Sequence, residues 1–261
     1  MSILICPICG NALHEENGSF LCSERHSFDL SKEGYLNLLP VNRHKSRHPG
    51  DAPELCRARR AFLAAGYYAP LRTFIADRLC GRIVLDACCG EGYYTSASSE
   101  RQFETYGFDI AKDMIRLAAK QDKRTQYFVA GLHQIPVRTE STDTLMHLFA
   151  PFHDAEFTRV LQKGGTLLSV LPGEQHLMGL KKVLYEVPYP NAEKLPGCSL
   201  PLIRKERLRY DICLQNTEDI LNLYGMTPYS YKTSRSAAET LASLPKLETT
   251  ADFLVLTYRK S

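Results

Sequence analysis

The sequence is constrained most by an alternation of short apolar runs with helical segments that begins at residue 82. The run "RIVLDACC" has the length of a buried strand, and later runs repeat it at residues 105–110, 126–131, 143–150 and 165–172. Between the runs, "AKDMIRLAAKQ" and "HDAEFTRVLQ" have helical composition. Strands that alternate with helices are typical of a parallel sheet with helices on both faces. We therefore predict an α/β fold with a doubly wound sheet.

Segments on both sides of this alternation extend the prediction. Two helices are expected before it, at residues 53–66 and 70–80, because a proline opens the first helix and a glycine closes it. Later helices and strands that should complete the domain lie at residues 174–186, 207–214, 216–225 and 252–260. Residues 188–204 are rich in proline and are interpreted as an insertion.

Composition excludes several classes of protein. The 261 residues are enough for one domain with a small accessory module, and no run approaches the eighteen or so apolar residues of a membrane span. The opening "MSILICPICG" lacks the basic patch and apolar core of a secretory signal. Nine cysteines in a chain of this length favour a reducing compartment with thiolates used as metal ligands. We predict a cytoplasmic protein with no membrane association.

Three cysteines and one histidine near the start of the chain have the spacing of a metal site. Cys6 and Cys9 form a C-x-x-C pair, and Cys22 and His26 follow after a spacer of hairpin length. Two short ligand pairs separated in this way suit tetrahedral coordination of zinc by three thiolates and one imidazole. Because four protein ligands leave no open position, the predicted zinc site is structural.

Alternatives to this zinc site remain open at the level of sequence. The four residues are unrelated in one alternative, and the C-x-x-C is a redox motif in the other, although a redox motif expects a following helix. His14, inside the spacer, is a rival ligand to His26. The spacer also holds Asn17-Gly18, which favours a hairpin turn. A segment of this length has little core of its own, so we expect the metal to supply its folding energy.

A second cluster follows the first predicted strand of the sheet, where residues 86–92 read "DACCGEG". Glycines at a strand-to-helix turn let the backbone approach a ligand, and the first N–H groups of the helix are free to bind it. The dinucleotide fingerprint G-x-G-x-x-G is absent. The stretch resembles motif I of class I S-adenosylmethionine-dependent methyltransferases, D-x-G-x-G-x-G, with Asp86, Gly90 and Gly92 matching and Cys88 replacing the first glycine. The resemblance implies a Rossmann-like fold that binds S-adenosylmethionine.

Other parts of this cofactor site are expected at the ends of the next strands. Asp109 ends the second strand, where a carboxylate accepts hydrogen bonds from both ribose hydroxyls of a nucleoside. Capping of a helix that starts at Ala111 is a second role, compatible with the first. After the third strand, His133 is either an adenine contact or a simple loop histidine. The fourth strand ends in "LFAPF" (148–152), where such enzymes contact substrate and methyl donor. The order of these elements favours a methyltransferase over a dehydrogenase.

Strings spread over nearly the whole chain carry a more specific resemblance. The zinc module, "FDLSKEGYLNLLP", "SRHPGD", "RARRAFLAAGYY", "CGEGYYT" and "PGEQHLMGLK" together resemble the RlmA family of 23S rRNA (guanine-N1)-methyltransferases. The resemblance implies methyl transfer to N1 of a guanine in a hairpin loop of 23S rRNA, by an enzyme that forms a homodimer. It implies zinc on the four residues named above. It also implies cofactor contacts on Tyr68, Gly90, Glu91 and His176. The chain departs from the family at Cys88 and at Phe152.

The chain divides into three predicted parts. Residues 1–38 form a zinc-binding RNA-recognition module, residues 39–81 a basic linker with helices, and residues 82–261 the methyltransferase domain. Basic side chains of the second part are expected to contact phosphates, with a solvated charged face as the alternative; they are Arg43, His44, Lys45, Arg47, His48, Arg57, Arg59 and Arg60. Further basic side chains expected on an opposite rim are Lys181, Lys182, Arg204, Lys205, Arg207 and Arg209.

An RNA guanine as substrate requires two further kinds of residue, one that stacks on the base and one that accepts its proton. A base splayed out of a hairpin loop stacks on aromatic side chains, and the candidates are Tyr67, Tyr93, Tyr94 and Phe152. The proton on guanine N1 needs an acceptor, and the candidates, none of them preferred, are Asp113, Asp143, His147, His153 and Asp154. Two other functions stay open. One is methylation of a small molecule or a protein, with the zinc module as a protein-docking site. The other is a regulatory protein that binds the cofactor without catalysis.

Overall fold

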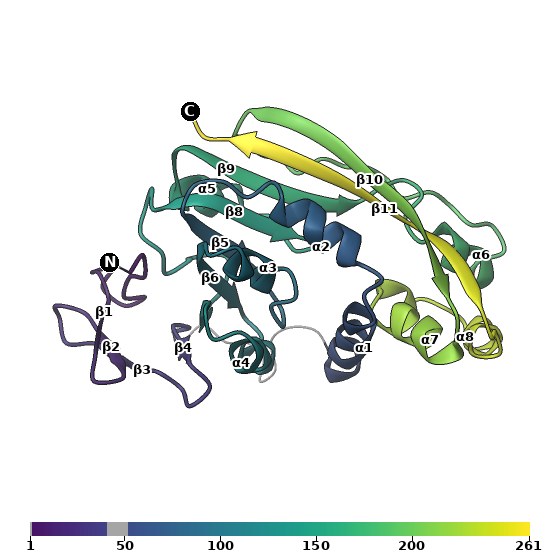
Figure 1. The fold of residues 1–261 in the computed structure, drawn as a ribbon, viewed down its shortest axis with the longest axis horizontal. Coiled ribbons are helices and arrows are strands. Elements are labelled where there is room, and N and C mark those ends of the chain that lie inside the picture. The colour runs from purple at the N-terminus through teal and green to yellow at the C-terminus, as the bar shows by residue number, and fades with distance from the viewer. Residues whose placement is uncertain (1, 41–51) are drawn as a thin grey trace.

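An eight-stranded mixed sheet forms the centre of the protein (Figure 1). The structure is a computed structural model that describes residues 2–40 and 52–261. From one edge to the other, the strand order is β10 (Leu202–Leu214), β11 (Leu247–Arg259), β9 (Leu161–Pro172), β8 (Thr142–Leu148), β5 (Ile83–Ala87), β6 (Glu104–Asp109), β7 (Gln126–Val129) and β4 (Tyr35–Asn37). Neighbours from β4 to β9 pair in parallel, and β11 runs antiparallel to both β9 and β10. The predicted α/β fold is confirmed.

The order of the sheet locates the place where a ligand binds. From β5 the chain moves to β6 and β7 on one side, and then returns to β8 and β9 on the other side. In open parallel sheets, ligands bind beyond the carboxyl ends of the strands at such a reversal. The ends of β5 and β8 therefore mark the candidate site.

Helices cover the sheet and fill its connections. They are α1 (Pro53–Ala64), α2 (Ala69–Ala76), α3 (Thr95–Glu100), α4 (Lys112–Gln121), α5 (Asp154–Val160), α6 (Met178–Leu184), α7 (Thr217–Gly225), α8 (Arg235–Ala242) and the 3₁₀ turn η2 (Pro228–Tyr231). The helix expected over residues 174–186 is shorter, because the chain first makes a turn in which Leu177 is left-handed with φ 58°. In the described ranges no helix is both long and apolar enough to cross a membrane.

Alternate residues on the central strands supply two hydrophobic layers, one on each face of the sheet. Val84 and Met146 point to one face and pack with buried side chains of α1, α2, α7 and α8. Leu85 and Leu145 point to the other face and pack with Phe157 of α5. This arrangement explains why the strands read as continuous apolar runs rather than as alternating ones, since both faces are covered.

The N-terminal ribbon (residues 2–30) is a three-stranded antiparallel sheet of β1 (His14–Glu16), β2 (Ser19–Leu21) and β3 (Ser27–Asp29). Asn17 and Gly18 connect the first two strands with φ values of 51° and 81°. Two left-handed residues are what a tight hairpin turn of this kind requires, and the predicted turn is confirmed. After the ribbon, the chain enters the large sheet as β4, which pairs in parallel with β7.

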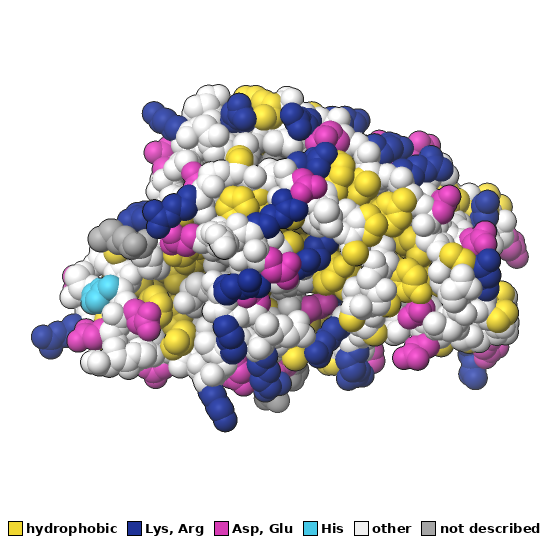
Figure 2. Space-filling model, viewed as in Figure 1, with side chains coloured by type: hydrophobic (Ala, Val, Ile, Leu, Met, Phe, Trp, Pro, Cys, Tyr) yellow, Lys and Arg dark blue, Asp and Glu magenta, His cyan; other side chains and the backbone are white. Residues whose placement is uncertain are grey.

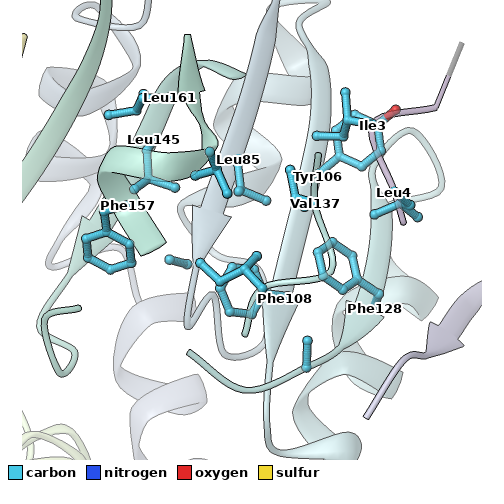
Figure 3. Packing of buried hydrophobic residues seen from close by; sticks show 14 of the residues in the cluster. Ile3, Leu4, Leu85, Tyr106, Phe108, Phe128, Val137, Leu145, Phe157 and Leu161 are labelled. Atoms are coloured by element: carbon cyan, nitrogen blue, oxygen red, sulfur yellow. The ribbon is translucent and has the colours of Figure 1, made fainter. Parts of the chain in front are cut away.

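The ribbon shares its hydrophobic core with the large sheet. Ile3 and Leu4 are fully buried and lie against Tyr106, Phe128 and Val137 (Figure 3). Backbone contacts support this packing, because the N–H of Ile5 donates to the carbonyl of Pro136 at 3.0 Å. A folded metal site is therefore not the only interaction that stabilises the ribbon. Packing of its apolar side chains against the sheet stabilises it as well. The division at residues 38 and 81 stays a prediction.

Candidate cofactor and metal sites

Four side chains of the ribbon converge as ligands for one metal ion. The sulfurs of Cys6, Cys9 and Cys22 and an imidazole nitrogen of His26 all lie within 4.8 Å of one another. The Sγ atom of Cys9 lies 3.6 Å from that of Cys22, and Nδ1 of His26 lies 3.5 Å from Cys6 Sγ and 3.4 Å from Cys22 Sγ. Tetrahedral zinc with its usual bond lengths separates ligand atoms by roughly 3.5–3.8 Å. The donor set and its spacing fit zinc.

The surroundings of this cluster agree with a closed structural site. Cys6 and Cys22 are buried in the shared core, and His14, the rival ligand, lies exposed on β1 outside the cluster. Burial opposes ionisation of Cys22, but hydrogen bonds from the backbone of His26 and Glu24 outweigh it and lower the pKa of this thiol to about 7. The thiolate is the form that binds zinc.

The loop after β5 has the backbone shape that its glycines predict. Cys88, Gly90 and Gly92 have φ values of 59°, 56° and 80°, all in the left-handed region. A Cβ atom added at Gly92 would lie 2.5 Å from the hydroxyl of Tyr127, so this position accepts no side chain. A Cβ atom added at Gly90 would meet no atom within 4 Å, so the backbone there faces open space. The loop therefore packs closely on one side and offers its backbone to a ligand on the other.

Asp109 ties this loop to the next strand. It ends β6, and its Oδ2 atom accepts a hydrogen bond of 3.1 Å from the N–H of Gly90. Its Oδ1 atom accepts from the N–H of Ala111 at 2.8 Å, just before α4 begins at Lys112. The carboxylate that was expected to bind ribose is thus fixed in orientation beside the loop.

Glu91 is a buried carboxylate without a hydrogen-bond partner. It is 5% exposed, and neither of its oxygens is hydrogen-bonded within the described part of the chain. Burial raises the pKa of Glu91, against the opposing charges of Arg59 and Arg60. A buried carboxylate is unfavourable unless a cation or donor pairs with it. S-adenosylmethionine carries a sulfonium and an ammonium group, so this carboxylate fits such a ligand.

Asp86, at the end of β5, has a different environment. It is buried and accepts a hydrogen bond of 2.6 Å from the hydroxyl of Thr95, the first residue of α3. Burial raises the pKa of Asp86 to about 7, and the nearby charge of Asp109 adds to the shift. The side chain holds the strand to the helix across the loop. Its contact with the cofactor stays a prediction.

Tyr68 and His176 form a buried pair, although sequence pattern alone gives no reason to choose them. The hydroxyl of Tyr68 lies 3.2 Å from Nε2 of His176, and Nδ1 of His176 accepts from the N–H of Asp252 at 3.3 Å. Burial lowers the pKa of His176 to about 3, so the ring is neutral. Because Nδ1 accepts, Nε2 carries the proton and donates to Tyr68. The Tyr68 hydroxyl is then free to donate its own proton to a ligand.

A series of aromatic rings in contact connects Tyr68 and His176 to the loop after β5. Phe253 on β11 lies 5.0 Å from Tyr68 and 4.8 Å from His176, between ring centroids. Phe149, just after β8, lies 5.7 Å from Phe253 and 6.5 Å from Tyr94, which follows the loop. Phe149 is left-handed with φ 55°, an unfavourable state for a bulky residue that often marks a functional site. Phe253 was not predicted, because an apolar residue inside a strand gives no signal.

Two of the candidate proton acceptors are occupied by structural hydrogen bonds. Asp143 accepts from the N–H of Ile83 at 2.7 Å, at the beginning of β5 and away from the strand ends. His147 is buried, with Nδ1 2.9 Å from the hydroxyl of Ser169 and Nε2 2.8 Å from the carbonyl of Ala150. Burial lowers the pKa of His147. Neither group is free to take a proton from a substrate.

The other three candidates are also engaged. His153 caps α5 by accepting from the N–H of Glu156, and Asp154 accepts from the N–H of Ser199 at 2.8 Å. Asp113 is exposed on α4 and lies 3.6 Å from Arg116. The geometry therefore selects no general base among the five.

The residues predicted to contact RNA have mixed outcomes. Arg43, His44, Lys45, Arg47 and His48 lie outside the described residues. The prediction for Lys181 is wrong, because this side chain is fully buried. Arg207 pairs with Glu193 and with Asp252. Lys182, Lys205 and Arg209 are exposed, as the rim prediction requires.

The aromatic residues predicted to stack on a base make packing contacts within the protein, and their contact with a base stays a prediction. The hydroxyl of Tyr67 donates to Asp219 at 2.7 Å, and its ring stacks on Phe62. Tyr93 and Tyr94 pack edge-to-face on each other at 5.0 Å. Phe152 packs edge-to-face on His147 and on Phe157. All four predicted residues are half-buried.

Two cavities lie next to the candidate cofactor site, but neither of them is that site. A cavity of about 150 Å³ lies behind the loop, lined by Glu91, Gly92 and Tyr127. It is smaller than the usual pocket for a ligand of cofactor size. A larger cavity of about 540 Å³ lies between α6 and the paired strands β10 and β11, and the predicted cofactor residues do not line it. The open backbone and the oriented carboxylate of the loop fit the expected cofactor better than either cavity does.

The strained position of Cys88 generates a stability prediction. A left-handed conformation costs an L-residue roughly 1–2 kcal/mol, and glycine avoids this at an entropic cost of about 0.5–1 kcal/mol. We expect Cys88→Gly to raise the free energy of unfolding by up to about 1 kcal/mol. Cys88→Val should lower it, because β-branching worsens the strain. Urea denaturation measures both. A valine variant as stable as the glycine variant would contradict the strain.

The pKa of Asp86 generates a pH prediction. A carboxyl whose pKa rises from 3.8 to about 7 on folding stabilises the folded state fully at low pH, and this contribution is lost as the pH rises through 7. Between pH 3.8 and about 7, ionisation of Asp86 lowers the free energy of unfolding by at most about 1.4 kcal/mol per pH unit. Asp86→Asn should remove that decline. Urea denaturation of both proteins at pH 5 and pH 8 checks it, and equal pH dependence would contradict it.

Comparisons with known proteins match both the N-terminal ribbon and the parallel part of the sheet. Residues 4–47 match the family described as RlmA, N-terminal, and residues 84–168 match a family described as methyltransferase domain. A solved methyltransferase structure from Anaeromyxobacter dehalogenans has a TM-score of 0.54, covers 73% of this chain and 95% of its own, and is 20% identical. This likeness shows the fold.

Two relatives match over nearly the whole chain. The 23S rRNA (guanine(748)-N(1))-methyltransferase of Streptomyces fradiae is 30% identical over 259 residues, 93% of this chain and 91% of the relative. A Bacillus subtilis protein, named provisionally as a 23S rRNA (guanine-N(1)-)-methyltransferase, is 29% identical over 98% of this chain and 96% of its own. The chain belongs to the RlmA family of 23S rRNA (guanine-N1)-methyltransferases.

Proposed function

We propose that this protein transfers the methyl group of S-adenosylmethionine to N1 of one guanine in a hairpin loop of 23S rRNA. The match to the Streptomyces fradiae enzyme carries this proposal, because it covers 93% of this chain and 91% of that enzyme. Two features of the structure support it. The ribbon holds a complete four-ligand metal cluster, and the loop after β5 offers open backbone beside an oriented carboxylate.

The cofactor seat follows from the hydrogen-bonding needs of its residues. Asp109, already oriented by two backbone N–H groups, accepts the ribose hydroxyls. Glu91 pairs with positive charge on the methionine part, which relieves its buried carboxylate. Gly90 lets the backbone come close, and Tyr68, held by His176, donates its free hydroxyl proton. When bound, S-adenosylmethionine supplies an electrophilic methyl group on sulfur.

The chemistry rests on position rather than on an activated side chain. Methyl transfer to a ring nitrogen is an in-line displacement, and holding the two atoms in near-attack geometry lowers its barrier most. Ring contacts of Tyr94 and Phe149 connect the loop through Phe253 to the Tyr68–His176 pair, so these rings border the proposed site. The five candidate bases are engaged elsewhere, and the N1 proton is assigned to no residue.

The ribbon is proposed to read the RNA, with zinc on Cys6, Cys9, Cys22 and His26. The closed ligand set leaves the metal no part in the reaction, and the match of residues 4–47 to the RlmA family supports this assignment. An rRNA substrate also supports a cytoplasmic location. The homodimer stays a prediction, which light scattering of the purified protein tests.

A methyl-transfer assay tests the proposed function. The protein is incubated with tritiated S-adenosylmethionine and unmodified 23S rRNA, and reverse transcription then maps the modified base. We expect one labelled N1-methylguanine at a loop position, and no label with Asp109→Ala, which lacks the ribose-binding carboxylate. Label in a small molecule or a protein would favour the alternative methyltransferases. Cofactor binding without any transfer would favour a regulatory protein.

A further inference from the structure

Tyr189 is an exposed aromatic side chain that its neighbours hold in place. It lies in the proline-rich segment between α6 and β10 and is 52% exposed. The ring of Tyr185 lies 5.5 Å away between centroids, and Nζ of Lys181 lies 4.7 Å from the centroid of Tyr189. An exposed ring with this support loses little conformational freedom when a partner binds it.

The support beneath the ring is a buried ammonium group. Lys181 is fully buried, and its Nζ atom donates to the carbonyl of Tyr189 at 2.9 Å and to Oδ1 of Asn191 at 2.6 Å. Throughout residues 2–40 and 52–261 no carboxylate forms an ion pair with it. An ammonium buried without a carboxylate is unfavourable by itself. The arrangement places the amino group of Lys181 under an exposed ring, and burial lowers the pKa of this group.

The same segment is tied to the cofactor site. The backbone N–H of Asn191 donates to the carbonyl of Glu174 at 2.9 Å, and its side-chain amide donates to the carbonyls of Gly173 and His176 at 2.9 and 3.1 Å. The turn at residues 173–176 carries His176, the partner of Tyr68. Only one residue, Pro190, therefore separates the exposed ring from the amide that fixes this turn.

Basic side chains lie on the surface near this segment. Lys182 of α6 and Arg209 of β10 line the cavity of about 540 Å³ between α6 and the paired strands β10 and β11, as do the acidic Asp211 and Glu248. Figure 2 shows Lys and Arg side chains along the upper right edge of the molecule, where Figure 1 places β10. The ribbon lies at the opposite end of the long axis from α6 (Figure 1). An RNA bound to both ends would cross the region of the cofactor loop.

We propose that Tyr189 is a stacking platform for a base of the RNA loop that flanks the target guanine. This inference rests on the proposed function. Single-stranded RNA binds through bases stacked on aromatic rings and phosphates held by basic side chains, and this surface offers both. The amino group of Lys181 under the ring, with Lys182 and Arg209 on the neighbouring surface to meet phosphates, favours RNA as the partner. Tyr189 supplies the exposed ring that the half-buried Tyr67, Tyr93, Tyr94 and Phe152 do not.

Substitution of Tyr189 tests the platform with a matched control. The ligand is a 23S rRNA hairpin transcript that carries the guanine mapped by reverse transcription. Removal of a stacking ring costs roughly 5- to 150-fold in Kd, so Tyr189→Ala should weaken RNA binding in this range, whereas Tyr189→Phe keeps the ring and stays within about twofold of wild type. Tyr231, 66% exposed but without a described ring contact, provides the control Tyr231→Ala. The Kd for S-adenosylmethionine should not change in any variant.

A spectroscopic measurement identifies the contact itself. The fluorescent base 2-aminopurine is placed in turn at each unpaired loop position, and stacking on Tyr189 should quench it at one position in wild type but not in Tyr189→Ala. Equal RNA binding by Tyr189→Ala and wild type, or equal losses in Tyr189→Ala and Tyr231→Ala, would overturn the platform. If wild-type protein neither binds nor methylates the hairpin, the proposed function itself has failed.

Discussion

The hydrophobic core shared by the ribbon and the sheet is the interaction on which the rest of the structure depends. Ile3 and Leu4 insert against β6 and the chain after β7, and β4 then extends the same sheet (Figure 3). A metal site on a flexible tether would bind RNA at no fixed distance from the cofactor. Here the metal cluster and the strand ends belong to one packed body, so a nucleotide held by the ribbon has a defined relation to the reacting methyl group.

The cofactor loop shows how such a site combines close packing with access. Gly92 is pressed against Tyr127, and Gly90 faces open space two residues earlier. Cys88 is left-handed at the position of the first glycine in D-x-G-x-G-x-G, which locates the strain created by the departure from this motif. At the other end of the site, the backbone of Asp252 fixes the tautomer of His176 and so frees the hydroxyl of Tyr68.

Sequence predicted those features that depend on local pattern. The alternation of apolar runs with helical segments was enough to predict the sheet, and the ligand spacing was enough to predict the zinc cluster. Both signals lie in residues that are close in the sequence. Contacts between segments that lie far apart in the sequence could not be predicted from it. Phe253 meets Tyr68 only because β11 lies beside β9, and Tyr189 is fixed by Lys181 through a fold of the proline-rich segment. The burial of Lys181 could not be predicted from its basic side chain, because the elements that pack against a helix determine which of its side chains are buried.

Removal of zinc tests most directly whether the ribbon reads the RNA while the sheet holds the cofactor. Zinc is stripped with a chelator, and binding of the 23S rRNA hairpin and of S-adenosylmethionine is measured on the same sample by titration. Because Ile3, Leu4 and β4 stay anchored in the sheet, the Kd for S-adenosylmethionine should stay within about twofold, while RNA binding falls at least tenfold and returns with added zinc. Equal loss of both ligands, or RNA binding that survives without zinc, would contradict the account.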